Sequence, residues 1–220
     1  MIVYLFSDIY QIMGRIIDKL LVIITISVAM IFAITTFFVD FLVPKNIDTE
    51  NGLIFGNKNA KVTLVMFEDF KCKYCKEYFN ETFPEIKERY IDTGKIKYVI
   101  IPLSFIYGSK LLTNAAIGIY ELKKDQFFEF ISIVSEKKSK NLTKQDLIKI
   151  ASNLKGVNLE IFNEFLDQKV FNNYLDENME HAKKIMPTFE VPAVYINGHR
   201  IDIDKIENAI EDRLTYKEYK

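Results

Sequence analysis

The chain contains two cysteines, and both lie in one short motif, Cys72-Lys73-Tyr74-Cys75. The motif follows an apolar run of β-type residues, Val62–Phe67, and opens a segment with helical periodicity. Two thiols three positions apart at the start of a helix face the same side and can close into a disulfide. Unpaired backbone N–H groups and the positive end of the helix dipole favour the thiolate of the first cysteine. The pattern therefore favours a redox pair at a strand-to-helix junction.

A lone C-x-x-C motif has two other interpretations, a zinc site and a purely structural disulfide. Zinc takes four protein ligands, or three and a water, and only His181 and His199 could add imidazoles. Neither histidine has a ligand-like spacing from the cysteines. A disulfide across three residues closes too small a loop to stabilise a fold much. We therefore expect no metal and no organic cofactor, and a redox-active Cys72–Cys75 pair.

Leu20–Val39 is an uncharged apolar run of 20 residues. As a helix it is just long enough to cross roughly 30 Å of hydrocarbon. Bulky phenylalanines stand where a cleaved signal peptide needs small residues, which favours a retained anchor. Arg15 and Lys19 precede the run and Lys45 follows it, so the bias of basic residues keeps the N-terminus inside. We expect a single-pass anchor at 20–43 in the cytoplasmic (inner) membrane, residues 1–19 in the cytoplasm and an extracytoplasmic, periplasmic catalytic domain.

The remainder of the chain has a mixed α/β pattern. Residues 44–59 combine glycines, asparagines and mixed charges, which predicts a tether and a globular part that starts near Ala60. Residues 60–109 read as strand, helix, strand, which suggests parallel pairing with a right-handed crossover. Residues 110–186 are helical throughout, and residues 187–220 return to strands and a last helix. We expect a small mixed sheet with an inserted helical domain.

The hydrophobic periodicity, together with proline and glycine positions, predicts the individual helices and strands. One helix is expected from about Cys72 to Ile91, kinked by Pro84. Asn197-Gly198 fits a type I′ turn and predicts a hairpin. The expected strands are 62–67, 95–101, 193–196 and 199–201, and the further helices are 111–123, 126–136, one starting at Thr143 with a capping box to Asp146, 158–167, 170–185 and 204–214.

Three segments are informative together: Gly56–Val62, Phe70–Cys75, and Val191-Pro192 ahead of a strand that ends in Asn197-Gly198. In these segments the chain resembles the DsbA-like family of thioredoxin-fold disulfide oxidoreductases. The helical insert between the two halves matches that family's helical domain. The resemblance covers about residues 55 to 214. It implies an α/β thioredoxin fold with an inserted helical domain, here preceded by one transmembrane helix.

The resemblance also implies roles for particular residues. Cys72 would be the exposed nucleophile and Cys75 its buried partner. Pro192 would be a cis-proline packed against the disulfide, with the Val191 backbone pairing with an extended substrate strand. From the residues alone, an ordinary trans proline that opens an edge strand is the simpler interpretation of Pro192.

The dipeptide between the cysteines, Lys73 and Tyr74, is expected to tune the redox poise. The Lys73 cation should stabilise the Cys72 thiolate, and a lower thiol pKa makes the disulfide a stronger oxidant. Many relatives carry a buried acid six residues before the first cysteine, where this chain has Met66. Glu68 lies two positions on, on the same strand face, and is a possible proton relay. The alternatives are that the proton passes straight to solvent and that Glu68 is a solvated surface carboxylate.

Together these features predict a membrane-anchored thiol–disulfide oxidoreductase that forms disulfides in cysteine-containing exported polypeptides. A membrane partner would reoxidise it. The alternatives are a reductase or isomerase that uses the same pair, and a redox-inactive tethered binding or holdase module. Val191, where isomerase relatives often have threonine, favours oxidation. Lys and Arg number 29 against 30 Asp and Glu, so no basic field indicates a nucleic-acid partner.

Overall fold

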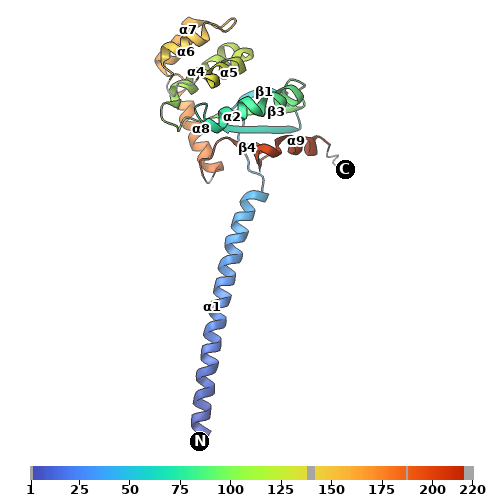
Figure 1. Ribbon diagram of the computed structural model, residues 1–220, viewed down its shortest axis with the longest axis vertical. Coiled ribbons are helices and arrows are strands. Elements are labelled where there is room, and N and C mark those ends of the chain that lie inside the picture. The colour runs from blue at the N-terminus through green and yellow to red at the C-terminus, as the bar shows by residue number, and fades with distance from the viewer. Residues whose placement is uncertain (1, 138–141, 187, 216–220) are drawn as a thin grey trace. The chain divides into compact units, whose positions relative to one another are not determined.

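The computed structural model describes residues 2–137, 142–186 and 188–215, with side chains described outside 2–12, 15 and 36–42 (Figure 1). The chain divides into two compact units, Met1–Val43 and Pro44–Lys220. The Arg15 side chain, which enters the expected topology, and Pro187, near which the last segment is expected to start, lie outside the described part.

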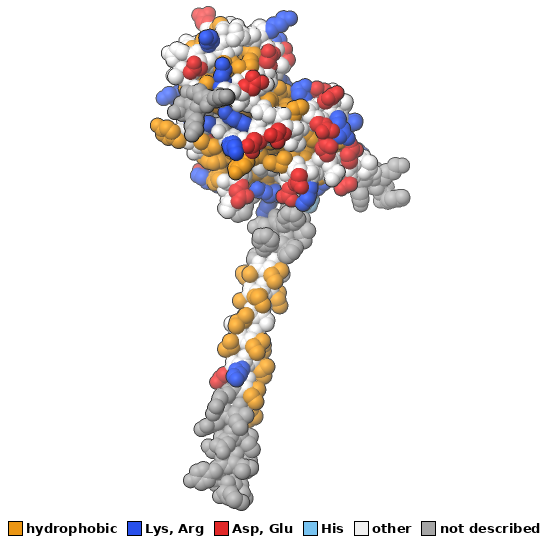
Figure 2. Space-filling model, viewed as in Figure 1, with side chains coloured by type: hydrophobic (Ala, Val, Ile, Leu, Met, Phe, Trp, Pro, Cys, Tyr) orange, Lys and Arg blue, Asp and Glu red, His pale blue; other side chains and the backbone are white. Residues whose placement is uncertain are grey.

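The first unit is one helix, α1 (Ile2–Leu42). Its segment Ile16–Thr35 is long and apolar enough to cross a membrane, and none of this segment is buried. Figure 2 shows hydrophobic side chains along the coloured part of this helix. The hydroxyls of Thr25 and Thr35 donate hydrogen bonds to backbone carbonyls of their own helix, so they leave no polar group unsatisfied in an apolar surrounding. α1 is therefore a candidate membrane helix, and its apolar segment starts a few residues before the expected anchor at 20–43.

The second unit is built on a five-stranded sheet of order β1-β3-β2-β4-β5. β2 and β3 are parallel, and the other three pairs are antiparallel. Both strands expected on either side of the cysteine helix are confirmed, and each extends one residue further along the chain than predicted. The strands are β1 (Leu53–Gly56), β2 (Val62–Glu68), β3 (Ile96–Pro102), β4 (Ala193–Ile196) and β5 (His199–Ile201).

β1 corrects the expected tether at 44–59. Leu53 and Phe55 are buried, and β1 pairs antiparallel with β3 at the sheet edge. Ahead of it, the Lys45 N–H already donates to the Gly198 carbonyl at 2.8 Å. The glycines and asparagines that suggested a flexible segment flank a four-residue strand. Gly56 has a φ of 71° and ends the strand with its Cα close to the β3 backbone, which is why no larger residue fits there.

The helix after the cysteines is not one kinked helix as predicted but three segments. They are α2 (Lys73–Glu81), α3 (Phe83–Ile86) and the π-helical η1 (Lys87–Ile91). Pro84 lacks an N–H and stands in the first turn of α3, where none is required. The proline therefore starts a new helix at this point.

A block of helices separates β3 from β4. Its capping box at Thr143 and Asp146 is confirmed, because the Thr143 side chain accepts the Asp146 N–H while the Asp146 carboxylate accepts the Thr143 N–H. The block consists of α4 (Ser109–Lys123), η2 (Lys124–Gln126), α5 (Phe127–Glu136), α6 (Lys144–Ala151), α7 (Leu159–Gln168) and α8 (Asn172–Ile185).

The sheet carries a core on each face, because successive strand residues point to opposite sides. Leu64 and Met66 of β2 join the larger core with α2 to α7 and the last helix, α9 (Ile206–Thr215). Val65 and Phe67 join a second core with the C-terminal half of α8. The inserted helices are thus packed on the sheet through a shared core.

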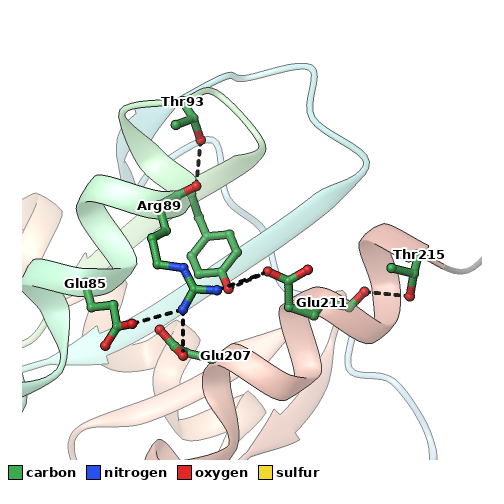
Figure 3. A network of polar contacts seen from close by, with 7 residues as sticks. Glu85, Arg89, Thr93, Glu207, Glu211 and Thr215 are labelled. Carbon is green, nitrogen blue, oxygen red and sulfur yellow. Dashed lines mark hydrogen bonds and ion pairs between the residues drawn. The ribbon is translucent and has the colours of Figure 1, made fainter.

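Two features fix the C-terminal part. Asn197 and Gly198 have φ values of 49° and 82°, so the expected β4–β5 hairpin is confirmed with its type I′ turn. The short 3-10 turn η3 (Ile203–Lys205) then leads into α9. Figure 3 shows how α9 is held: Arg89 of η1 pairs with Glu85 of α3 and with Glu207 and Glu211 of α9.

Candidate active site

The C-x-x-C motif lies where β2 gives way to α2. Cys72 is the N-cap residue of α2, with extended backbone angles of φ −66° and ψ 132°. Its N–H donates to the Asp69 carbonyl at 2.8 Å, and its own carbonyl accepts the first helical hydrogen bond, from Lys76. The Cys72 sulfur therefore stands at the positive end of α2, beside N–H groups that have no partner within the helix.

The motif is brought to Val191-Pro192, 119 positions further along the chain. The Val191–Pro192 peptide bond is cis. The Cys72 thiol donates to the Val191 carbonyl with an S···O distance of 3.5 Å. Cys72 is 8% exposed and Cys75 is 2% exposed, so the nucleophile expected to be exposed is in fact largely covered. Its sulfur contacts the cis-proline segment, which is the segment expected to hold a substrate strand.

The two thiols differ sharply in acidity. The pKa of Cys72 is lowered from 9.0 to about 6, first by a hydrogen bond from the Cys75 thiol and then by the N–H groups of Cys75 and Tyr74. Burial and the Asp69 charge oppose this shift. The pKa of Cys75 is raised, mainly by burial, then by its hydrogen bond to Cys72 and by the Glu68 charge. One cysteine is thus poised as a thiolate and the other as a thiol.

Lys73 pairs with an acid of its own helix, and its expected effect on the Cys72 thiolate stays a prediction. Its Nζ pairs with Glu77 at 3.2 Å, and the side chain is 79% exposed. The groups that shift the Cys72 pKa most are Cys75, burial, two backbone N–H groups and Asp69, and Lys73 is not among them. The dipeptide between the cysteines contributes through the Tyr74 N–H. The Tyr74 ring itself is exposed.

Glu68 is buried, so the alternative of a solvated surface carboxylate is wrong. Its pKa is raised from 4.5 to about 8, first by burial and then by the charges of Asp69 and Cys72. Met66 is also fully buried and fills the core. Glu68 and Cys75 line a small cavity of about 10 Å³, which is room for about one water molecule. The other lining residues are Phe70, Lys76, Phe79, Ile131, Val134 and Ser135.

Asp69 is a buried site residue whose hydrogen bonds sequence reasoning did not predict. One carboxylate oxygen accepts the Lys71 N–H at 2.9 Å. The other accepts the Ile106 N–H at 3.0 Å and the Ser109 hydroxyl at 2.8 Å. The available signal was an aspartate directly after a strand, a position where its side chain can accept the N–H two residues on. The partners near residue 106 could not be inferred from spacing.

Residues 103–108, which link β3 to α4, form the third side of the site. The Leu103 N–H donates to the Glu68 carbonyl at 2.8 Å, and the Lys71 ammonium donates to the Tyr107 carbonyl at 2.6 Å. Phe105 is 39% exposed and lies against Phe189, with ring centroids 5.7 Å apart. Tyr107 is 91% exposed. Two aromatic side chains therefore reach solvent between the cysteine turn and the cis-proline segment.

Comparison with known proteins identifies the family. The sequence model of the family described as thioredoxin matches residues 48–212. The chain belongs to this family. A probable disulfide bond formation protein D of Bacillus cereus is 31% identical over 167 residues, covering 72% of this chain and 77% of the relative. Disulfide bond formation protein D of Bacillus subtilis is 28% identical, covering 74% and 78%. Oxidised BdbD from Bacillus subtilis superposes with a TM-score of 0.70 at 27% identity, covering 79% of this chain and 98% of that one.

The protein is accordingly a DsbA-like thiol–disulfide oxidoreductase, and its function lies in disulfide formation. The thioredoxin fold with helical insert, expected from the resemblance, is confirmed. The matched region starts at residue 48, ahead of β1, in agreement with the strand that replaces part of the expected tether.

The two histidines considered as zinc ligands lie apart from the cysteine motif in the fold. His181 is on α8, where its ring lies edge-on to Phe67, and His199 is in β5. Among the described residues, no group of three or more His, Cys, Asp or Glu side chains could hold a metal ion. The cysteine pair is the redox centre that family members use.

Proposed function

We propose that Cys72 and Cys75 form the redox-active disulfide and that the protein transfers this disulfide to cysteine-containing exported polypeptides. The observation that carries the direction is the stabilised Cys72 thiolate at the start of α2. A thiolate stabilised in the dithiol form makes that form favourable, so the disulfide gives up its oxidising equivalents readily.

The reaction proceeds through a mixed disulfide. A substrate thiolate attacks the Cys72 sulfur, the Cys72–Cys75 bond breaks, and Cys75 leaves with the electron pair. A second substrate thiolate then attacks the substrate sulfur of the mixed disulfide and expels Cys72 as a thiolate. The substrate loses two electrons and gains a disulfide, and the protein gains the two electrons as a dithiol. An extended substrate is held by the Val191 backbone. In the disulfide form Cys72 has no thiol hydrogen, so the Val191 carbonyl no longer accepts a hydrogen bond from Cys72 and can pair with the substrate.

Glu68 supplies the proton that the leaving Cys75 sulfur needs. Cys75 is buried, so its thiolate is costly and must be protonated as it leaves. With a pKa of about 8, Glu68 carries a proton at neutral pH. The cavity shared by the two side chains has room for a water molecule between them. The carboxylate left behind is reprotonated from solvent, or accepts the Cys75 proton when the disulfide is restored.

The anchor places this chemistry at a membrane. Residues 20–43 hold the protein in the lipid bilayer of the cytoplasmic membrane, residues 1–19 stay inside, and the catalytic unit works outside. A membrane partner removes the two electrons and restores the disulfide. The catalytic unit consists of two thioredoxin halves, 60–109 and 187–220, around the helical insert 110–186, and β1 adds an edge strand to the first half.

The test uses the full chain in detergent, oxidised and mixed with a reduced peptide that carries two cysteines. Disulfide formation in the peptide is expected for the wild type and lost in Cys72→Ser. In cells, acid trapping followed by alkylation should find the Cys72–Cys75 pair mostly as a disulfide. A pair found mostly as dithiol would contradict an oxidase and indicate a reductase or isomerase.

A further inference from the structure

Asp69 lies in the turn between the strand and the cysteine helix, and it is fully buried. Its carboxylate accepts three hydrogen bonds from two separate segments. The bond from the Lys71 N–H fixes the turn that delivers Cys72 to the helix start. The bonds from the Ile106 N–H and the Ser109 hydroxyl fix the segment between β3 and α4. One side chain thus ties together two parts of the site that are nearly 40 positions apart.

The electrostatic effect of Asp69 runs against the chemistry of Cys72. Its negative charge raises the pKa of the Cys72 thiol, whereas the reaction requires a stable thiolate. A buried carboxylate also carries a desolvation cost. A neutral residue at this position would leave the Cys72 pKa lower. The contribution of Asp69 therefore lies in the two segments that its hydrogen bonds hold in place.

Those hydrogen bonds hold residues 103–108, called here the aromatic rim. The rim exposes Phe105 and Tyr107 and contacts the cis-proline segment through Phe105 and Phe189. It therefore lies beside both segments that an incoming peptide must meet, the cysteine turn and the cis-proline segment. Exposed aromatic rings next to a reactive centre suit contact with apolar residues that flank a substrate cysteine.

We propose that Asp69 is a positioning residue that fixes the aromatic rim beside Cys72, so that Phe105 and Tyr107 recognise apolar residues flanking the substrate cysteine. This inference rests on the proposed role of Cys72 as the nucleophile. It predicts that peptide substrates depend on Asp69 more strongly than a small dithiol does, because the small dithiol reaches the sulfur without touching the rim.

The experiment compares oxidation of an apolar dithiol peptide with oxidation of dithiothreitol by the full chain in detergent. An excess of a small-molecule disulfide restores the Cys72–Cys75 disulfide after each turnover, and its direct reaction with each substrate is subtracted. In Asp69→Asn, an amide NH₂ replaces one acceptor oxygen, so one of the two backbone N–H groups loses its partner. We expect kcat/KM for the peptide, relative to kcat/KM for dithiothreitol in the same variant, to fall about tenfold, mainly through the peptide KM. The dithiothreitol value takes account of any change at Cys72 itself. The pH midpoint of Cys72 alkylation should move down, because the opposing charge is gone.

Two further variants keep the test decisive. Tyr107→Ala changes an exposed side chain, so folding is not at risk, and it should raise the peptide KM without moving the alkylation midpoint. Asp146→Asn makes the same chemical change in the remote capping box of α6. It should change the oxidation rate of neither the peptide nor dithiothreitol. If Asp69→Asn does not fold, Tyr107→Ala decides alone.

Equal losses for peptide and dithiothreitol in Asp69→Asn, or an unchanged peptide KM in Tyr107→Ala, would overturn the inference. Failure of the proposed function has a different signature, because the wild type would then oxidise neither substrate, or Cys72→Ser would still oxidise both.

Discussion

Cys72 and Cys75 are the same residue type three positions apart, and the fold gives them opposite chemistry. Cys72 caps the N-terminus of α2 and has a pKa of about 6. Cys75 lies one turn inside the helix, is almost fully buried, and has a raised pKa. The N–H groups of Tyr74 and Cys75 lower the pKa of the first thiol, whereas burial and the Glu68 charge raise the pKa of the second. The position of each thiol relative to the helix start and the core therefore decides which one reacts.

The difference also links the two sulfurs. The largest contribution to the low Cys72 pKa is the hydrogen bond from the Cys75 thiol. Cys75 remains a thiol, and so remains a donor, because burial keeps its own pKa high. The low pKa of Cys72 thus depends on the high pKa of Cys75, which keeps Cys75 protonated.

Removing Cys75 tests this link and has the largest expected effect. Cys75→Ala deletes the donor, so the pKa of Cys72 should rise by roughly one unit from its value of about 6. Peptide oxidation is lost because the variant cannot form the disulfide. The pH dependence of iodoacetamide alkylation measures the pKa, and Cys75→Ser, which keeps a hydroxyl donor, is the matched control. An unchanged midpoint in Cys75→Ala would show that the helix terminus alone sets the acidity.

Glu68→Gln tests the environment of Cys75 and should have an intermediate effect. Without the buried acid, Cys75 leaves unprotonated, so mixed-disulfide formation should slow by roughly tenfold in stopped-flow measurements at pH 7. Cysteine alkylation at Cys72 should persist. A rate equal to that of the wild type would show that the Cys75 proton comes directly from solvent.

The same substitution changes stability with pH in a defined direction. The folded pKa of Glu68, about 8, lies above its ordinary value of 4.5. Between these values the folded protein keeps a proton that the unfolded chain releases, so wild-type stability falls as pH rises. Glutamine has no proton to release. The Tm advantage of reduced Glu68→Gln over the reduced wild type should therefore grow from about pH 4.5 to about pH 8. A constant difference would contradict a buried, protonated Glu68.

The sequence predicted the parts of the site that depend on local order. Cys72 and Cys75 lie at a strand-to-helix junction, and the Asn197-Gly198 turn has the backbone angles that its residue types require. Groups brought in from a distance could not be inferred in this way. The partners of Asp69 come from the β3–α4 link, and β1 was hidden because its four residues lie between asparagines and glycines.

Lys73 shows the limit of arguing from sequence proximity, and it has the smallest expected effect. A cation next to Cys72 in the sequence suggested a strong influence on the thiolate, but the Lys73 ammonium pairs with Glu77 in solvent. Exposed charges are screened, so Lys73→Met should move the alkylation midpoint of Cys72 by less than about 0.3 units. Peptide oxidation should stay within about twofold of wild type. A midpoint that rose as far as in Cys75→Ala would restore the side-chain charge as the cause of the low pKa. A small shift of the alkylation midpoint that vanishes in high salt would show that Lys73 has little effect. The N–H groups and the Cys75 thiol would then account for the low pKa of Cys72.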